Sequence, residues 1–137
     1  MSPAAEFTLP VRVYYEDTDA GGVVYYANYL RFLERARTEW LRRLGCGREE
    51  LRARAGWIFV VRRVEADYLR PARLDDLLSV QVRVIEALGA SLRFAQRIYA
   101  EDGSELLRAS VQVACVDAQS FKPRRLPAAL RAQLTPA

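Results

Sequence analysis

Carboxylates and glycines gather in one short stretch of the sequence, and they are its first candidates for chemistry. Asp17 and Asp19 stand two positions apart, Gly21 and Gly22 follow, and an amphipathic segment begins near Asn28. A carboxylate can attack a carbonyl carbon or activate a water molecule against it. The first N–H groups of a helix are unpaired and can polarise a carbonyl oxygen. The stretch therefore indicates acyl transfer or hydrolysis.

Other interpretations of the same stretch fit less well. A calcium loop beginning at Asp17 would place Gly21 at its fifth position, where no side-chain oxygen is available. Asn28 would replace the bidentate glutamate at the end of that loop. An aspartyl phosphatase could use aspartates in this spacing, but that chemistry normally needs Mg²⁺ and a larger α/β scaffold. The simplest alternative is that Asp17 and Asp19 only cap and solvate a loop.

The 137 residues include no histidine. Its absence excludes a Ser–His–Asp triad, a Cys–His pair, histidine-bound zinc and a histidine general base. The two cysteines, Cys46 and Cys115, are not in a CxxC pair and cannot supply the four ligands of a zinc site. We therefore expect no metal, a reducing compartment, and Cys115 as a small core residue.

The charge pattern also limits the partners. There are 21 basic residues against 17 acidic ones, for a net charge of +4. The arginines are scattered and interleaved with acidic residues, whereas a nucleic-acid binder would cluster them, so we expect no nucleic-acid partner. They either solvate the surface or, in a few places, hold the phosphates of a nucleotide-bearing substrate. With no leader pattern and no apolar stretch of about 18 residues, we expect a cytoplasmic protein.

Two periodicities predict the elements around the acidic stretch. Alternation predicts a half-buried strand over Phe7–Glu16. Apolar residues at steps of three and four predict an amphipathic helix from Asn28 to Leu44, with Asn28 as N-cap and Gly45 following its end. A second, short helix is expected over 48–54.

The rest of the chain predicts a β-meander. Short turns join its strands, so neighbours must be antiparallel. A single long helix on an antiparallel sheet of about five strands gives an α+β domain. We expect one domain over 1–137, with a core of about 7–120 and a basic tail over 121–137, in which a short helix is expected after Pro127. The four strands are expected at Trp57–Tyr68, Leu78–Leu88, Ser91–Ala100 and Glu105–Val116.

Four segments are similar to a known family. They read YEDTDAGGVVY at 15–25, ANY at 27–29, ERARTEWL at 34–41 and ADYLRPARLDD at 66–76. They resemble the hotdog-fold thioesterases of the 4-hydroxybenzoyl-CoA thioesterase type, most closely their Tol–Pal-associated, YbgC-like branch. With the meander, the likeness covers about residues 8–120.

The resemblance implies a fold, an assembly and a reaction. The fold would be a hotdog, in which an antiparallel sheet wraps one long helix. Two subunits would pair their sheets with the active site at their interface, and dimers would associate into a homotetramer. The substrate would be an acyl-CoA, with coenzyme A part of the substrate and no cofactor or metal. Asp19 would be nucleophile or general base, and the backbone N–H of Tyr26 would polarise the thioester carbonyl.

The sequence departs from this branch at one position. The branch commonly reads Tyr-His-Ala-Asn where this chain has Tyr25-Tyr26-Ala27-Asn28. A phenol, with a pKa near 10, cannot act as a base at neutral pH as imidazole can. The Asp19 mechanism does not need that histidine, but hydratases of the same fold generally pair histidine with a carboxylate, so hydratase activity is disfavoured.

Further residues are weaker candidates for substrate binding. Trp57 and Phe59 would line an acyl pocket or simply pack in their strand. Glu16 and Asp17 would hold the loop or face solvent, and Tyr15, Tyr29 and Trp40 would belong to the core. The alternative function is a non-catalytic acyl-CoA-binding or envelope-machinery scaffold, linked to the Tol–Pal system. The remaining substrate-binding candidates are Gly22, Val24 and Tyr25 in the loop, and Arg124 and Arg125, with Lys122, for the CoA phosphates.

Overall fold

The computed structural model describes residues 6–45, 47, 52 and 56–134. Cys46 and nearly all of the short helix predicted over 48–54 lie outside the described residues. In chain order the elements are β1 Glu6–Arg12, the 3₁₀ turn η2 Tyr15–Asp17, α1 Asn28–Arg43, β2 Trp57–Tyr68, β3 Leu77–Leu88, β4 Ser91–Tyr99, β5 Glu105–Asp117 and α3 Ala128–Leu134.

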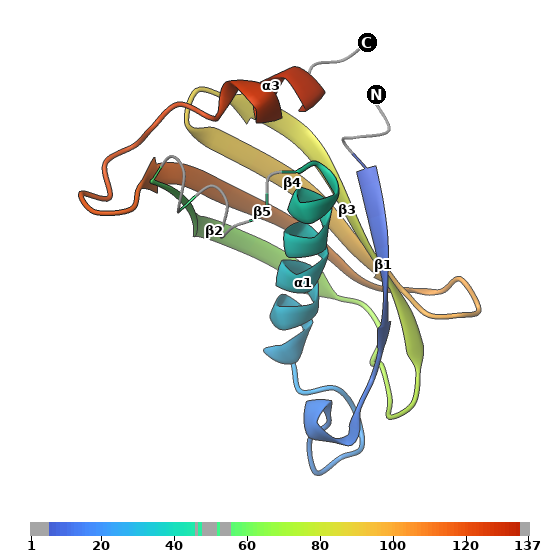
Figure 1. Ribbon diagram of the computed structural model, residues 1–137. Helices are drawn as coiled ribbons and strands as arrows, with labels where there is room; N and C mark the ends of the chain where they lie inside the picture. Colours follow the sequence, from blue (N-terminus) through green and yellow to red (C-terminus); the bar gives the residue numbers. More distant parts are fainter. Residues whose placement is uncertain (1–5, 46, 48–51, 53–55, 135–137) are drawn as a thin grey trace.

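The strands form one sheet in the order β1-β3-β4-β5-β2, and every neighbouring pair is antiparallel. The sheet curves around one face of α1, so the predicted α+β architecture is confirmed (Figure 1). Sequential strands β3, β4 and β5 are joined by tight turns. One of these turns contains Gly89 at a φ of 61°, a conformation that glycine adopts without steric cost. β1 and β2 are left as the two edges.

The first strand is shorter than its alternation predicts. Residues alternate between exposed and buried as far as Val13, but the ladder ends at Arg12 and a 3₁₀ turn follows. The Asp17 carboxylate accepts a hydrogen bond from the Tyr14 N–H at 2.8 Å, and such local bonds compete with a sheet ladder. Tyr15, expected in the core, is therefore 83% exposed.

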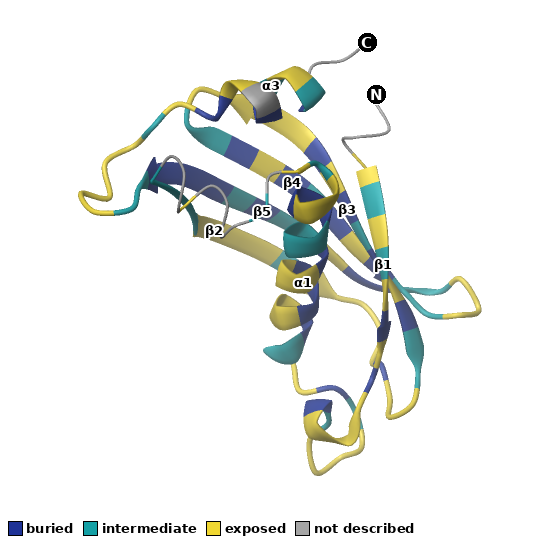
Figure 2. Ribbon diagram, in the orientation of Figure 1, coloured by how far each residue is buried: buried dark blue, intermediate teal, exposed yellow. Residues whose placement is uncertain are grey.

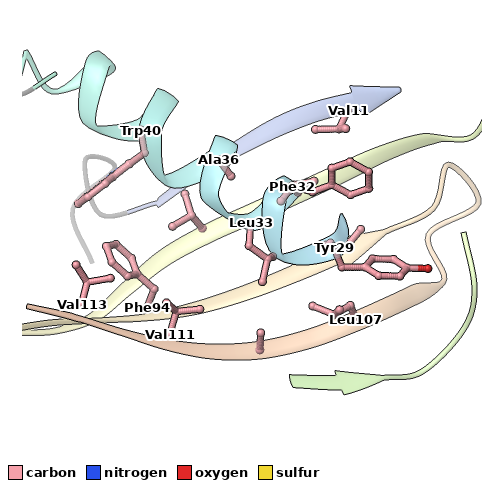
Figure 3. Packing of buried hydrophobic residues seen from close by; sticks show 14 of the residues in the cluster. Val11, Tyr29, Phe32, Leu33, Ala36, Trp40, Phe94, Leu107, Val111 and Val113 are labelled. Carbon is pink, nitrogen blue, oxygen red and sulfur yellow. The ribbon is translucent and has the colours of Figure 1, made fainter. Parts of the chain in front are cut away.

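The long helix packs its predicted stripe of apolar side chains against the sheet. Tyr29 and Trp40 are buried as expected, and the Trp40 ring meets the Phe94 ring edge-on at 5.4 Å between centroids (Figure 3). The N-cap is Ala27 rather than Asn28, because the Asn28 side chain instead donates to the Asp17 carbonyl. The pattern of buried positions along α1 and the strands is visible in Figure 2.

The core extends past residue 120, where the sequence placed its end. Leu126, Leu130 and Leu134 recur every four residues, and all three are buried. The Gln133 side chain also donates a hydrogen bond of 3.0 Å to the Leu44 carbonyl at the end of α1. The segment that looked like a basic tail thus covers one end of the core. Cys115 is fully buried, as expected.

None of the helices in the described ranges is long and apolar enough to cross a membrane.

Candidate active site

Asp19 lies at the base of a tight hairpin between η2 and α1. Thr18 and Val24 form an antiparallel bridge, and the Asp19 N–H donates to the Val23 carbonyl at 2.9 Å. The turn closes with the Gly22 N–H on the Asp19 carbonyl at 3.0 Å, and Gly22 has a φ of 80°. A side chain is strained in that conformation, so glycine at this position lets the chain turn back within a few residues.

One carboxylate oxygen of Asp19 is fixed by the turn itself. Asp19 Oδ1 accepts the Gly21 N–H at 2.8 Å, and a Cβ at Gly21 would lie only 3.2 Å from that oxygen. Asp19 is exposed, and none of the hydrogen bonds or ion pairs within the described ranges involves Oδ2. The arrangement holds the carboxylate in one orientation and leaves one oxygen open for reaction.

Backbone hydrogen bonds attach this hairpin to the rest of the fold. Val23 bridges to Arg73, and the Val24 N–H donates to the Ala72 carbonyl at 2.9 Å. Asp17 is buried and its carbonyl accepts the Tyr25 N–H at 3.0 Å, so the expectation that Asp17 holds the loop is confirmed. The Val24 side chain itself is buried in the core.

The turn between the hairpin and α1 presents unpaired backbone N–H groups. The Asn28 N–H donates to the Tyr25 carbonyl at 2.8 Å, but within the described part of the chain neither the Tyr26 nor the Ala27 N–H has a protein acceptor. The N-cap residue of α1 also supplies no side-chain cap. The positive end of the α1 dipole is therefore open beside the Asp19 hairpin.

Two tyrosines, Tyr29 and Tyr68, support this turn. The Tyr68 hydroxyl donates to the Tyr26 carbonyl at 3.0 Å, and its ring meets the Tyr29 ring edge-on at 5.5 Å between centroids. The Tyr29 hydroxyl accepts the Ala72 N–H at 2.9 Å. Burial raises the pKa of Tyr29, and the nearby Tyr68, Asp76 and Asp19 raise it further. Burial, and secondarily Tyr26, raises the pKa of Tyr68. Both phenols are therefore protonated at neutral pH.

One hairpin and the turn that follows it contain Asp19, Gly22, Val24, Tyr25 and Tyr26, with the Val24 side chain in the core, whereas the other predicted site residues lie elsewhere. Trp57 and Phe59 lie near the start of β2, and Tyr68 lies at its end. At the rise of an extended strand, the distance along β2 from Phe59 to Tyr68 is on the order of 30 Å.

A pocket of about 170 Å³ opens beside Phe59, between α1 and the sheet. Apolar side chains from four elements form most of its wall, and Glu34, Arg37 and Thr38 supply polar groups. The buried Gln96 accepts a hydrogen bond of 2.8 Å from Arg37. The pocket is lined by Glu34, Arg37, Thr38, Leu41, Phe59, Val61, Leu92, Phe94 and Val113.

The basic residues of the C-terminal segment are placed differently from one another. The Arg124 guanidinium lies 4.5 Å from the centre of the Trp57 ring and 3.8 Å from the Asp117 carboxylate. Lys122 and Arg125 are exposed.

Among the described residues, no group of three or more acidic or cysteine side chains could hold a metal ion.

The sequence did not indicate a role for Tyr68 or Ala72, which support the site directly but come from a segment far along the chain. Their segment, ADYLRPARLDD, was singled out only by its resemblance, which gave it no role. Tyr68 and Tyr26 are 42 positions apart in the chain. No local pattern predicts a contact at that separation, because it depends on how the end of β2 meets the start of α1.

Comparisons with known proteins agree with this geometry. The family model of the thioesterase-like superfamily matches residues 13–134. The chain is 50% identical over 127 residues to the acyl-CoA thioester hydrolase YbgC of Escherichia coli O6:H1, covering 93% of this chain and 94% of that protein. It is 49% identical over 126 residues to the acyl-CoA thioesterase YbgC of Haemophilus influenzae, covering 92% of each.

Solved structures show the same fold. A probable thioesterase from Bartonella henselae superimposes with a TM-score of 0.83 at 40% identity, covering 90% of this chain and 100% of that one. A 1,4-dihydroxy-2-naphthoyl-CoA thioesterase from Synechocystis gives a TM-score of 0.87 at 24% identity, covering 93% and 94%. The predicted hotdog fold is confirmed. The chain therefore belongs to the thioesterase-like superfamily, and within it to the YbgC acyl-CoA thioesterases.

Proposed function

We propose that this protein hydrolyses acyl-CoA thioesters to a free acid and coenzyme A, with Asp19 as the reacting carboxylate. One observation carries the proposal. A carboxylate with an open oxygen and a turn with unpaired N–H groups stand at the two ends of the same short hairpin. The YbgC relatives named above, which are acyl-CoA thioester hydrolases, support the choice of a thioester as substrate.

The chemistry follows from these two groups. The Tyr26 N–H would donate to the thioester oxygen and stabilise the negative charge that develops there. Asp19 would either attack the carbonyl carbon or take a proton from a water molecule that attacks it. In both cases the carbon–sulfur bond breaks and coenzyme A leaves as a thiolate. After direct attack, water would then hydrolyse the acyl–aspartate anhydride, which releases the free acid and restores the Asp19 carboxylate. No metal or cofactor is part of this proposal.

The acyl pocket would require a second copy of the chain. Phe59 lies on the order of 30 Å along β2 from Tyr68, which contacts the turn before α1, so it would not reach a thioester held at the hairpin of its own chain. β2 is an edge strand, and antiparallel pairing of two β2 strands about a two-fold axis would place the Phe59 end of one copy beside Tyr68 of the other. The active site would then lie at a homodimer interface.

The size of the pocket indicates what it could hold. Its volume is about 170 Å³, and an apolar cavity of roughly 150 Å³ holds benzene. An acyl group with about the bulk of one aromatic ring would therefore fit. Phe59 would line this pocket. Trp57 would stack on Arg124 beside it, and Arg124 and Arg125 would approach the CoA phosphates.

Two further aspects of the proposal come from the family resemblance: association of dimers into a homotetramer and a functional link to the Tol–Pal envelope system. A cytoplasmic location is proposed from the sequence pattern described above.

Replacing Asp19 by Asn tests the reaction. The amide cannot act as nucleophile or base, yet it can still accept the Gly21 N–H, so the hairpin should keep its shape. We expect Asp19→Asn to lose thiol release from acyl-CoAs by at least about a thousandfold, with an unchanged melting temperature. Asp75→Asn, at an exposed aspartate outside the hairpin, is the matched control.

The assay should span short, long and aromatic acyl-CoAs. Normal turnover by Asp19→Asn would contradict the role of Asp19. If the wild-type protein binds CoA esters tightly but hydrolyses none of them, the non-catalytic scaffold is the correct function instead.

A further inference from the structure

The turn that leads into α1 has two peptide planes whose carbonyls are both held. The Tyr25 carbonyl accepts the Asn28 N–H at 2.8 Å, and the Tyr26 carbonyl accepts the Tyr68 hydroxyl at 3.0 Å. In a trans peptide the carbonyl and the N–H point in opposite directions. Holding these carbonyls therefore fixes the directions of the next two N–H groups, those of Tyr26 and Ala27, which have no acceptor within the described part of the chain.

The two carbonyls differ in what holds them. The bond to the Tyr25 carbonyl is local, since it comes from the backbone three residues further on, and it forms with the turn itself. The bond to the Tyr26 carbonyl comes from the end of a strand 42 positions away. Within the described ranges it is the one hydrogen bond made by either group of the peptide between Tyr26 and Ala27.

Tyr68 is itself held in place. Its ring packs edge-on against Tyr29, at 5.5 Å between centroids, and against Tyr26, at 6.3 Å. Tyr29 is buried and accepts the Ala72 N–H, while the Ala72 carbonyl accepts the Val24 N–H. The phenol is thus connected to both ends of the segment from Val24 to Tyr29, and its hydroxyl is protonated at neutral pH, so it can donate.

We propose that Tyr68 is a positioning residue for catalysis, whose hydroxyl orients the Ala27 N–H as a second donor to the thioester oxygen, beside the Tyr26 N–H. This inference rests on the proposed function, because it requires a thioester oxygen at the start of α1. Tyr68 does not touch the reacting atoms. Its hydrogen bond also polarises the peptide between Tyr26 and Ala27, which strengthens the Ala27 N–H as a donor.

Tyr68→Phe tests the proposal, because it removes one oxygen atom and keeps the ring contacts. We expect kcat to fall about tenfold, the effect of losing one positioning hydrogen bond, while KM and the melting temperature stay unchanged. Tyr99→Phe, which removes a tyrosine hydroxyl from β4, is the matched control and should keep the wild-type kcat.

A spectroscopic measurement separates positioning from a structural role. The acyl-CoA that the wild-type protein hydrolyses fastest, labelled with ¹³C at the thioester carbonyl, is bound to Asp19→Asn, and its carbonyl stretch is recorded. Polarisation lowers this frequency on binding. We expect a smaller shift in the double variant Asp19→Asn, Tyr68→Phe.

The outcomes are distinct. An unchanged kcat in Tyr68→Phe would overturn the proposal, and so would a lower kcat with an unchanged carbonyl shift, since that pattern indicates a structural role. Full turnover by Asp19→Asn would overturn the proposed function itself, whatever Tyr68→Phe does.

Discussion

Tyr26 stands where the related branch commonly has histidine, and the structure indicates what that position contributes. Its ring is 62% exposed and packs against Tyr25, at 4.9 Å between centroids, and against Tyr68. Its N–H is unpaired within the described ranges, and a change of side chain leaves that group in place. The proposed contribution of residue 26 is therefore its backbone, so the loss of imidazole is compatible with hydrolysis.

Cys115 gives a prediction at the same scale. The side chain is fully buried, and burial raises the pKa of its thiol to about 11, with Arg124 opposing that rise. Only on the order of one molecule in a thousand is then a thiolate at pH 8. We expect the native Cys46→Ser variant not to react with Ellman's reagent at pH 8, and to react fully once unfolded in guanidinium.

The raised pKa of the Cys115 thiol also makes the stability of the fold depend on pH. The folded-state pKa lies above the unfolded one, so the buried thiol contributes stability below an unfolded pKa of about 8.5, and this is lost as pH rises toward 11. In the labelling experiment, the Cys115→Ser variant measures the reactivity of the Cys46 thiol separately. Rapid labelling of native Cys46→Ser at pH 8 would show that Cys115 is accessible.

Among the elements, α1 and α3 illustrate how apolar spacing determines packing. The stripe on α1 is long enough to be recognised from the sequence alone, and it packs against the sheet, nearest β1 and β3. α3, Ala128–Leu134, confirms the short helix expected after Pro127, but so short a segment has too few apolar repeats to predict that it packs on the core. Its buried leucines nevertheless belong to the same core.

Leu130→Ala tests the contribution of α3. Leu130 is fully buried, so truncation removes apolar contacts and leaves a cavity that the fold cannot entirely close. We expect the free energy of unfolding in urea to fall by about 2–5 kcal/mol. Leu88→Ala, at a leucine that is 71% exposed, is the control and should change it by less than about 0.5 kcal/mol. Equal effects of the two substitutions would show that α3 is dispensable for the core.

For the whole molecule, the decisive feature is an uncovered edge. β2 is a 12-residue strand whose outer side has no partner strand among the described residues, and it exposes Val61, Val64 and Tyr68. The same strand also exposes the charged residues Arg62, Arg63, Glu65 and Asp67. A long unpaired edge of this kind can pair with another strand. The proposed dimer would cover it and would bring the Phe59 pocket to the hairpin of the other copy.

Val64→Lys tests this assembly. Two-fold pairing of β2 would bring the two introduced lysines close together, and like charges on paired strands destabilise the pairing. We expect the variant to sediment as a monomer in analytical ultracentrifugation and to lose thiol release in parallel. Ile85→Lys changes a residue of similar exposure on β3, an interior strand, and should leave both properties unchanged. A Val64→Lys variant that remains dimeric and active would rule out pairing through β2.

The sequence by itself determined the fold class, the long helix, the meander and the place of Asp19 in a loop just before that helix. Strand alternation, helical spacing and turn residues depend on interactions within a few positions, so they can be recognised without a partner segment. Tertiary structure alone decided that Tyr68 reaches the Tyr26 carbonyl, that the Tyr29 hydroxyl meets Ala72, and that Phe59 is separated from Asp19. These relations join residues distant in the chain, and they depend on a strand order that leaves β2 at the edge, which no local pattern encodes.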